Sequence, residues 1–226
     1  MKKGQKVLAG PKTYWTAGFI LVLFVIYLFF MYGINAGLAF SWEKPIQAYF
    51  QSWDHGNWHV FFVYWTELGS TWMTRLAAAM LVIWLVWKKR DFIGGIACVV
   101  LVLANEQLNH FMKNLVARER PMVDPAIDAY GYSFPSGHAM ASIVTYGVIA
   151  YFLAKYADRK QQRWLIWLGA LVLIVSIGIS RVVLSAHFPT DIIAGYCLGL
   201  SFLLLVLATY DSFVPPKADN PEKELE

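Results

Sequence analysis

Three short groups of polar and charged residues interrupt a chain that is otherwise strongly apolar. Ionisable side chains beside apolar spans are costly, so groups of this kind are candidates for function. In chain order the groups are Lys113, Arg118, Arg120 and Pro121, then Pro135, Ser136, Gly137 and His138, and then Ser180, Arg181, His187 and Asp191. They supply cations, backbone donors, two imidazoles and one carboxylate, which together suit the binding and transfer of a phosphoryl group.

The spacing of the first group places two cations within reach of one anion. Lys113 and Arg120 are seven residues apart, so a continuing helix would carry them on one face, two turns and about 10 Å apart. Pro121 discourages helix at Arg120 and beyond it. Arginine binds phosphate oxygens through parallel hydrogen bonds and lysine supplies a point charge, so this group predicts an anion site near a helix end.

The second group has the features of a helix start that faces a ligand. Ser136 stands at an N-cap position, directly before an apolar run. The backbone N–H groups of Gly137 and His138 would then point outward from the helix N-terminus, where they can hold an oxyanion. Gly137 also lets the backbone approach a ligand closely.

The third group places an imidazole beside a carboxylate. Pro189 suits the first turn of a helix, which leaves His187 just ahead of that helix and Asp191 in its first turn. At this separation Asp191 can accept a hydrogen bond from one nitrogen of His187. A histidine oriented in this way is a nucleophile or a base, and a second histidine can protonate a leaving group.

The composition shows which elements must position these groups. Of the 226 residues, 58% are hydrophobic and only 15% are charged, against roughly 25% charged in an average soluble domain. The mean hydropathy is +0.48. A compact soluble fold of this size could not bury so much apolar surface, which excludes a soluble globule, a disordered chain and a disulfide-stapled module. Cys98 and Cys197 each lie in an apolar run and are predicted to be buried thiols.

The predicted fold is all-α: a polytopic membrane protein with six transmembrane helices and short interfacial helices on the outer side, in one domain over residues 1–226. The predicted spans are 15–34, 72–87 (short, and extendable backwards), 92–112, 137–154, 164–184 and 190–209. Residues 41–66 mix aromatic and polar side chains, as amphipathic segments of the headgroup layer do. Gly195 and Gly199 are predicted to pack within the bundle.

The distribution of Lys and Arg predicts the orientation. With a cytoplasmic N-terminus the inner side carries thirteen of the nineteen basic residues, namely Lys2, Lys3, Lys6, Lys12, Lys88, Lys89, Arg90, Lys155, Arg159, Lys160, Arg163, Lys217 and Lys223. The positive-inside rule then places both termini in the cytoplasm and all three polar groups at the outer face. The same bias explains the net charge of +4 without nucleic acid. The charged, Pro-rich tail 215–226 is predicted to be disordered.

The three groups resemble the motifs of the type 2 phosphatidic acid phosphatase (PAP2) family, which is related to vanadium haloperoxidases. The motif K-x6-R-P is Lys113 to Arg120-Pro121, P-S-G-H is Pro135 to His138, and S-R-x5-H-x3-D is Ser180-Arg181, His187 and Asp191. All three are complete and in order over residues 113–191. Six spans also match the bacterial membrane phosphatases of the family, so the resemblance extends over nearly the whole chain.

The resemblance implies a role for each matched residue. His187 would be the nucleophile that forms a phosphohistidine, Asp191 would orient it, and His138 would protonate the leaving group. The phosphoryl oxygens would be held by Lys113, Arg120, Arg181, Ser136 and the backbone of Gly137. The family works without a metal, and no cofactor is expected here; Asp191 is the only carboxylate in the motifs, whereas a Mg²⁺ site usually takes one or two.

The leading functional hypothesis is a membrane lipid phosphatase that acts at the outer face of the cytoplasmic membrane. Its partners would be the bilayer and a lipid phosphate: phosphatidylglycerophosphate, undecaprenyl pyrophosphate or phosphatidic acid. The motifs read the phosphate and not the tail, so they leave the substrate open, as they do the oligomeric state. Two other classes stay open, a haloperoxidase-like oxidoreductase that holds vanadate at His187, and a non-catalytic binder or transporter of lipid phosphates.

Polar residues near the motifs receive structural interpretations. Arg118 and Glu119 lie between matched positions and are interpreted as a surface ion pair. Asn105, Glu106 and Asn109 form a polar stripe within the third span. We interpret this stripe as an interhelical network that supports the site.

Overall fold

The computed structural model describes residues 11–38, 40–121 and 131–214, and these residues form helices and connections without a strand. The helices are α1 (Pro11–Asn35), α2 (Glu43–Gln51), α3 (Asn57–Thr66), α4 (Thr71–Ile83), α5 (Phe92–Val116), α6 (Gly137–Lys155), α7 (Lys160–Val183) and α8 (Pro189–Phe213). A 3-10 turn (Glu67–Gly69) precedes α4 and a π-helical segment (Trp84–Lys89) follows it. The predicted all-α fold is therefore confirmed, whereas the tail 215–226 lies outside the described residues.

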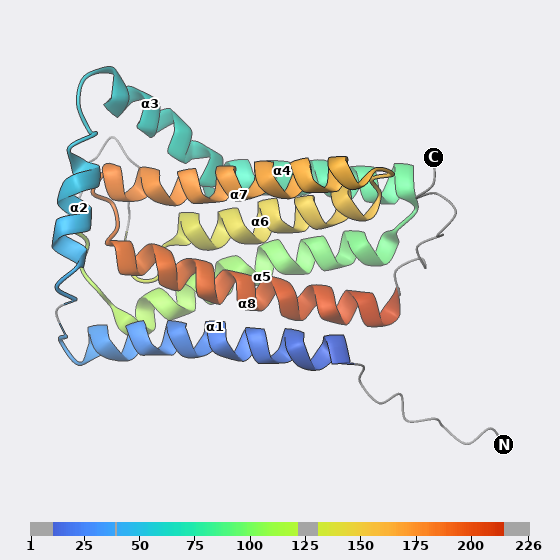
Figure 1. Cartoon of the computed structure of the whole chain (residues 1–226), viewed down its shortest axis with the longest axis horizontal. Coiled ribbons are helices and arrows are strands. Elements are labelled where there is room, and N and C mark those ends of the chain that lie inside the picture. Colours follow the sequence, from blue (N-terminus) through green and yellow to red (C-terminus); the bar gives the residue numbers. More distant parts are fainter. Residues whose placement is uncertain (1–10, 39, 122–130, 215–226) are drawn as a thin grey trace.

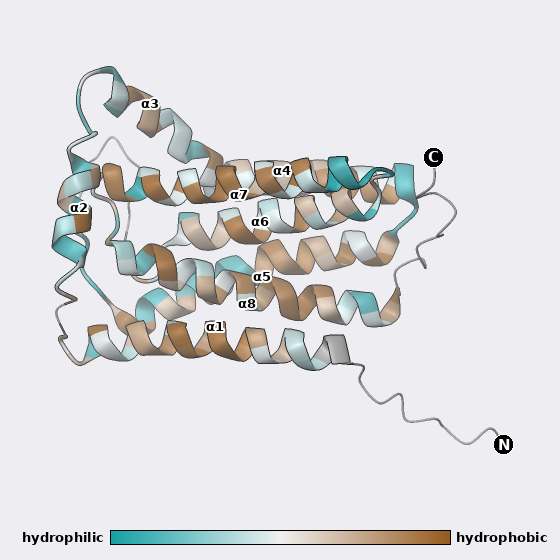
Figure 2. Ribbon diagram, viewed as in Figure 1, coloured by the Kyte–Doolittle hydropathy of each residue, from teal (hydrophilic) through white to brown (hydrophobic). Residues whose placement is uncertain are grey.

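Five of these helices, α1, α5, α6, α7 and α8, are long and apolar enough to cross a membrane. The predicted second span, 72–87, differs from the structure. It belongs to a pair of helical segments, Asn57–Gly69 and Thr71–Lys89, which are bent by 48° relative to each other. Only the two segments together are long and apolar enough to form a sixth span. The break falls at Ser70, whose backbone is extended and whose hydroxyl caps α4 by accepting a hydrogen bond from Met73 N at 3.3 Å. Figure 2 shows apolar residues along the helices and hydrophilic residues gathered near several of their ends.

The long helices lie side by side, with α2 across one end of the bundle and α3 leaning away from it (Figure 1). The first turn of α1 and the last turn of α8 lie at the opposite end from α2. Helix α6 is central, because it packs against α4, α5, α7 and α8. The predicted amphipathic region 41–66 corresponds to α2 and α3, and α2 buries Glu43 and Gln47 while most of its other side chains are exposed.

A carboxylate holds the helices together at the end away from α2. Asp91 caps α5 by accepting a hydrogen bond from Gly94 N at 2.8 Å. It also accepts hydrogen bonds from the hydroxyl of Tyr156, which follows α6, at 2.8 Å and from the hydroxyl of Tyr210, which lies in α8, at 2.5 Å. Burial raises the pKa of Asp91, but these three donors and the charge of Lys155 together outweigh burial, so the pKa is lowered overall.

Two glycines of α8 allow it to approach α6 closely, as predicted. A Cβ on Gly195 would lie 2.9 Å from the backbone oxygen of Ser136 and 3.0 Å from the Cβ of Ala139, and one on Gly199 would lie 3.3 Å from the Cα of Met140. These neighbours belong to the first turn of α6 or to its cap. The close contact therefore fixes the start of α6 against the helix that follows the third motif.

We expect Gly195→Ala to destabilise the fold, because the added methyl group would collide with backbone that cannot move aside, at a cost of about 1–3 kcal/mol. The matched control is Gly169→Ala in α7, where a Cβ would have no neighbour within 4 Å. Because alanine is the better helix former, the control should be neutral or stabilising. Thermal unfolding in detergent measures both variants, and equal midpoints would contradict the packing described.

Candidate active site

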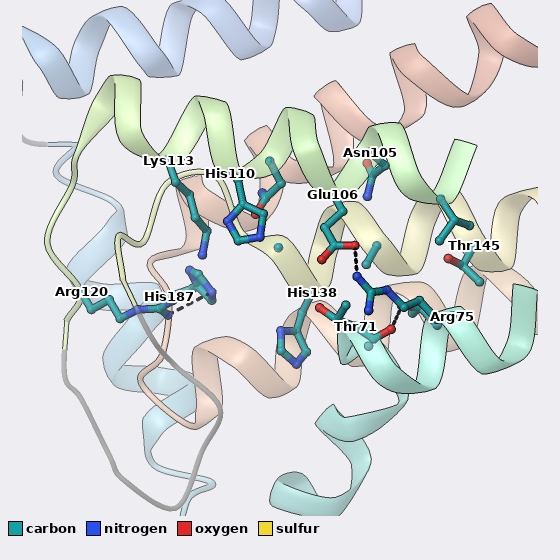
Figure 3. Close-up of a pocket in the computed structure, with 16 residues that line it drawn as sticks. Thr71, Arg75, Asn105, Glu106, His110, Lys113, Arg120, His138, Thr145 and His187 are labelled. Atoms are coloured by element: carbon teal, nitrogen blue, oxygen red, sulfur yellow. Dashed lines mark hydrogen bonds and ion pairs between the residues drawn. The ribbon is translucent and has the colours of Figure 1, made fainter. Parts of the chain in front are cut away.

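A cavity of about 290 Å³ brings residues of all three motifs together. The motif residues that line it are Lys113, Arg120, Gly137, His138 and His187. Figure 3 shows Lys113, Arg120 and His187 together at one end, with His138 farther along the cavity. Segments that lie up to 74 residues apart in the sequence (113 to 187) thus meet at one site, as their predicted common face of the membrane requires.

Arg120 reaches the site by a different route from the predicted one. Helix α5 ends at Val116, and Ala117 has a left-handed backbone with φ of 52°. Lys113 and Arg120 therefore do not share a helix face, and the prediction of a continuing helix is wrong. The loop turns Arg120 back toward the cavity, so both cations still line it.

Carbonyl oxygens fix the guanidinium of Arg120. Its Nε donates to the carbonyl of Gly131 at 2.8 Å and its Nη1 to that of Ala186 at 2.8 Å. Nη1 also lies 3.3 Å from Nε2 of His187. One ring nitrogen of His187 therefore faces a cation of the kind that binds phosphate oxygens.

His187 lies in the loop between α7 and α8 and is 1% exposed. Burial lowers its pKa well below the usual value, and the charges of Arg120, Arg181 and Lys113 lower it further. The imidazole is therefore neutral near pH 7 and keeps a lone pair for nucleophilic attack. Its Nδ1 lies 3.5 Å from Oδ2 of Asp191, a long contact of the kind that tightens when a substrate binds.

Arg118 is not a surface ion-pair partner of Glu119, and that interpretation is wrong. Its Nη1 donates to Oδ1 of Asp191 at 2.7 Å and to the hydroxyl of Thr190 at 2.8 Å. Its Nη2 lies 3.0 Å from the carboxylate of Glu43. The Arg118 side chain is only 15% exposed, so it is an interior part of the site.

This network satisfies a carboxylate that is completely buried. Asp191 is 0% exposed, and its two oxygens accept hydrogen bonds from Arg118 and from the backbone N–H of Phe188 at 2.9 Å. Glu43 of α2 accepts hydrogen bonds from Nη2 of Arg118 and from the hydroxyl of Thr190. Arg118 and Glu43 are 75 residues apart, and no local pattern in the sequence connects them.

Two residues predicted to hold phosphate lie behind the cavity wall. Ser136 is fully buried, and its hydroxyl accepts a hydrogen bond from Ala139 N at 3.4 Å, which is the predicted N-cap. Arg181 is also fully buried and donates to the hydroxyl of Thr66 at 3.0 Å. Neither is among the residues that line the cavity. Their contact with phosphate remains a prediction, although the charge of Arg181 already acts on His187.

The start of α6 presents the second imidazole to the cavity. His138 lines the cavity, and within the described part of the chain its buried Nε2 has no hydrogen-bond partner. Asn109 supports this turn by donating to the carbonyl of Pro135 at 3.2 Å. A Cβ on Gly137 would lie 3.1 Å from the amide oxygen of Asn109, so a glycine suits this close approach.

The polar stripe of α5 does form interhelical contacts, as interpreted. Asn109 reaches the loop before α6, and the carboxylate of Glu106 accepts a hydrogen bond from Nη2 of Arg75 in α4 at 2.6 Å. The side-chain oxygen of Asn105 is buried without a partner among the described residues. Arg75 lies outside the three motifs, so the sequence analysis did not predict it as a site residue.

The sequence model of the PAP2 superfamily matches residues 94–214, which include all three motifs. The chain therefore belongs to the PAP2 superfamily. It also superposes on the crystal structure of a transmembrane PAP2-type phosphatidylglycerolphosphate phosphatase from Bacillus subtilis, with a TM-score of 0.76 and 26% identity, over 88% of this chain and 98% of that chain. This match supports the multi-pass membrane fold.

Two curated relatives are similar over about half of this chain. Phosphatidylglycerophosphatase B of Bacillus subtilis (strain 168) is 37% identical over 113 residues, or 50% of this chain and 56% of the relative. The undecaprenyl-diphosphatase of Sulfolobus acidocaldarius is 32% identical over 127 residues, or 53% and 57%. The matched part thus spans little more than half the length of either relative.

The lowered pKa of His187 predicts how stability depends on pH. Below the ordinary histidine pKa of about 6.5, the unfolded chain binds a proton at this position that the folded protein does not. Stability should therefore fall as the pH falls, with a contribution from His187 of at most about 1.4 kcal/mol per pH unit. Unfolding midpoints at pH 7.5 and 5.5 measure the fall.

The fall in midpoint should be smaller in His187→Gln, which has no proton to gain at this position. His55→Gln is the matched control, because His55 is exposed and outside the cavity. A fall in His187→Gln as large as in the wild type would show that His187 does not have a lowered pKa.

Proposed function

We propose that the protein is a membrane lipid phosphatase that hydrolyses a lipid phosphate or lipid pyrophosphate, phosphatidylglycerophosphate or undecaprenyl pyrophosphate, through a phosphohistidine. The observation that carries the proposal is the buried His187, whose Nε2 faces Arg120 at 3.3 Å in a cavity among apolar helices. The charged head would enter the cavity while the tail stays among the spans. The printed names of the two curated relatives support this choice of substrates.

In the first step Nε2 of His187 attacks phosphorus, so an N–P bond forms and the bond from phosphorus to the leaving oxygen breaks. Lys113 and Arg120 stabilise the charge on the phosphoryl oxygens, with Arg181 behind them. His138 gives a proton to the departing oxygen, which leaves as the lipid alcohol or, from a pyrophosphate, as the lipid monophosphate.

In the second step water attacks the phosphohistidine and His138 accepts its proton. The N–P bond breaks, inorganic phosphate leaves, and His187 is neutral again. Asp191 stabilises the imidazolium character that develops on His187 during both steps, and Arg118 keeps its carboxylate in place. Three cationic side chains offset the phosphate charge, so we expect this chemistry to need no metal.

The orientation follows from charge and from the arrangement of the helices. The first turn of α1 and the last turn of α8 lie at the end opposite to α2, and Glu43 of α2 contacts the site residue Arg118. Because the basic residues favour the side of the termini, both termini would be cytoplasmic and the site would face outward. The protein would then work in the cytoplasmic membrane on lipids of its outer leaflet.

We expect His187→Ala to lower phosphate release from these lipids by roughly 10³- to 10⁶-fold, because it removes the nucleophile. Asp191→Asn should lower it by about 10²- to 10⁴-fold, because the imidazole loses its orienting charge. The assay uses purified protein with EDTA present, and acid quenching should trap labelled phosphohistidine in the wild type.

His55→Ala is the control, because it removes an exposed histidine outside the cavity. A non-catalytic binder or transporter would show no turnover that depends on His187, so full phosphate release by His187→Ala would overturn the mechanism. A haloperoxidase-like protein would instead oxidise halide when vanadate and peroxide are added.

Arg118 is a positioning residue, so its loss should affect turnover more than substrate binding. We expect Arg118→Gln to lower kcat by about 10- to 100-fold, the effect of losing a charge-assisted hydrogen bond, while KM changes little. Arg118→Lys should restore part of kcat, because an ammonium can still pair with Asp191. Values are normalised to folded protein, and a normal kcat in Arg118→Gln would contradict the role of the network.

A further inference from the structure

The catalytic groups occupy only one end of the cavity. The other end is lined by Arg75, Asn105, Glu106 and Thr145, and Figure 3 shows these residues on the far side of His138 from Lys113. This end lies between α4, α5 and α6. A polar compartment between apolar helices is costly, and the mechanism proposed above does not use it.

The ion pair in this compartment leaves most of its donors unused. Nη2 of Arg75 donates to Glu106 at 2.6 Å, the one hydrogen bond of the Arg75 side chain that we find among the described residues. A guanidinium has five N–H donors, so the pair is neutral as a whole but can still bind another anion. The side chains are 48% and 23% exposed, so a ligand in the cavity can reach both.

Asn105 is the second sign of a ligand site. Its side chain is 4% exposed and lines the cavity, and its amide oxygen has no hydrogen-bond partner among the described residues. A buried amide without a partner costs free energy, and a bound polar group would remove that cost. The cavity thus has a cation, an acceptor and an unsatisfied amide at one place.

The polar compartment lies nearer the middle of α5 and α6 than Lys113 and His138 do, on the side where the tail of a bound lipid would run. Trp72 and Leu76, next to Arg75 on α4, are 74% and 46% exposed and would face lipid. A lipid held with its scissile phosphate at His187 and its tail along α4 would place the intervening part of its head beside Arg75. Only a head group with polar atoms between phosphate and tail would use these residues.

We propose that Arg75, Glu106 and Asn105 form a second polar subsite, which selects phospholipids that carry the scissile phosphate on a short polyol spacer. This inference rests on the proposed phosphatase function. Arg75 would bind the phosphodiester between spacer and tail, and Glu106 would accept a hydrogen bond from a spacer hydroxyl. Phosphatidic acid has neither group, because its scissile phosphate is joined directly to the diacylglycerol.

The separation of the two ends favours a spacer over a diphosphate. Lys113 and Glu106 are seven residues apart on α5, which corresponds to a rise of about 10 Å. A three-carbon polyol can cover much of that distance between two phosphorus atoms, whereas a diphosphate joins them through a single oxygen. The second phosphate of a diphosphate would therefore stay near Lys113.

The test compares kcat/KM for phosphatidylglycerophosphate with kcat/KM for phosphatidic acid. In Arg75→Gln/Glu106→Gln, which leaves no unpaired charge, we expect this ratio to fall by about 10- to 100-fold, because a charge-assisted contact made only by the first lipid is lost. Undecaprenyl pyrophosphate is the third substrate in the test. The ratio of its kcat/KM to that of phosphatidic acid should stay within about twofold of the wild-type ratio, since its second phosphate would make no such contact.

A second variant, Asn105→Leu, tests the subsite independently if the double variant folds poorly. It should also lower the ratio of kcat/KM for phosphatidylglycerophosphate to that for phosphatidic acid. Arg90→Gln is the matched control, because Arg90 is exposed, follows α4 at the other end of the bundle and should leave the ratio unchanged. An unchanged ratio in both cavity variants, or a fall confined to the diphosphate, would overturn the subsite. If the wild type released phosphate from none of the lipids, the proposed function itself would fail.

Discussion

The pairing of Arg118 with Asp191 is the interaction on which the site depends. Asp191 is completely buried, and an unpaired carboxylate there would cost several kcal/mol. Arg118 and the backbone N–H of Phe188 satisfy it, and the other terminal nitrogen of Arg118 pairs with Glu43. Since this chain of contacts joins α2, the loop after α5 and the start of α8, the carboxylate next to His187 is held by three separate segments.

The surroundings of His187 keep its imidazole neutral, which the proposed role as a nucleophile requires. Burial lowers the pKa of His187, and the positive charge of Arg120, Arg181 and Lys113 lowers it further. The cations that would bind a phosphate therefore also keep the imidazole neutral before the phosphate arrives. Once the phosphate binds, its negative charge offsets the cations, and Asp191 can stabilise the charge that develops on the ring. The cations proposed to bind the phosphate thus add to the effect of burial on His187.

The two ends of the cavity are lined by different residues, and we have proposed phosphoryl transfer at one end and substrate selection at the other. At one end Lys113, Arg120 and His187 would act on any phosphate monoester. At the other end Arg75 and Glu106 form an ion pair that is neutral as a whole, which lowers the cost of ionised groups among apolar helices. Superfamily membership accounts for the first end, whereas the second is specified by residues that lie outside the three motifs.

Local composition and short spacing were enough to predict the helical class, five of the spans, the three motifs and the cap at Ser136. They did not determine the bend at Ser70, the left-handed turn at Ala117 or the partners of Arg118. Those depend on which side chains meet when distant helices pack: Glu43 lies 75 residues from Arg118, and Arg75 lies 31 from Glu106. Charged side chains between helices pair with the partner that packing brings near, so these pairings follow from the tertiary structure and not from local spacing.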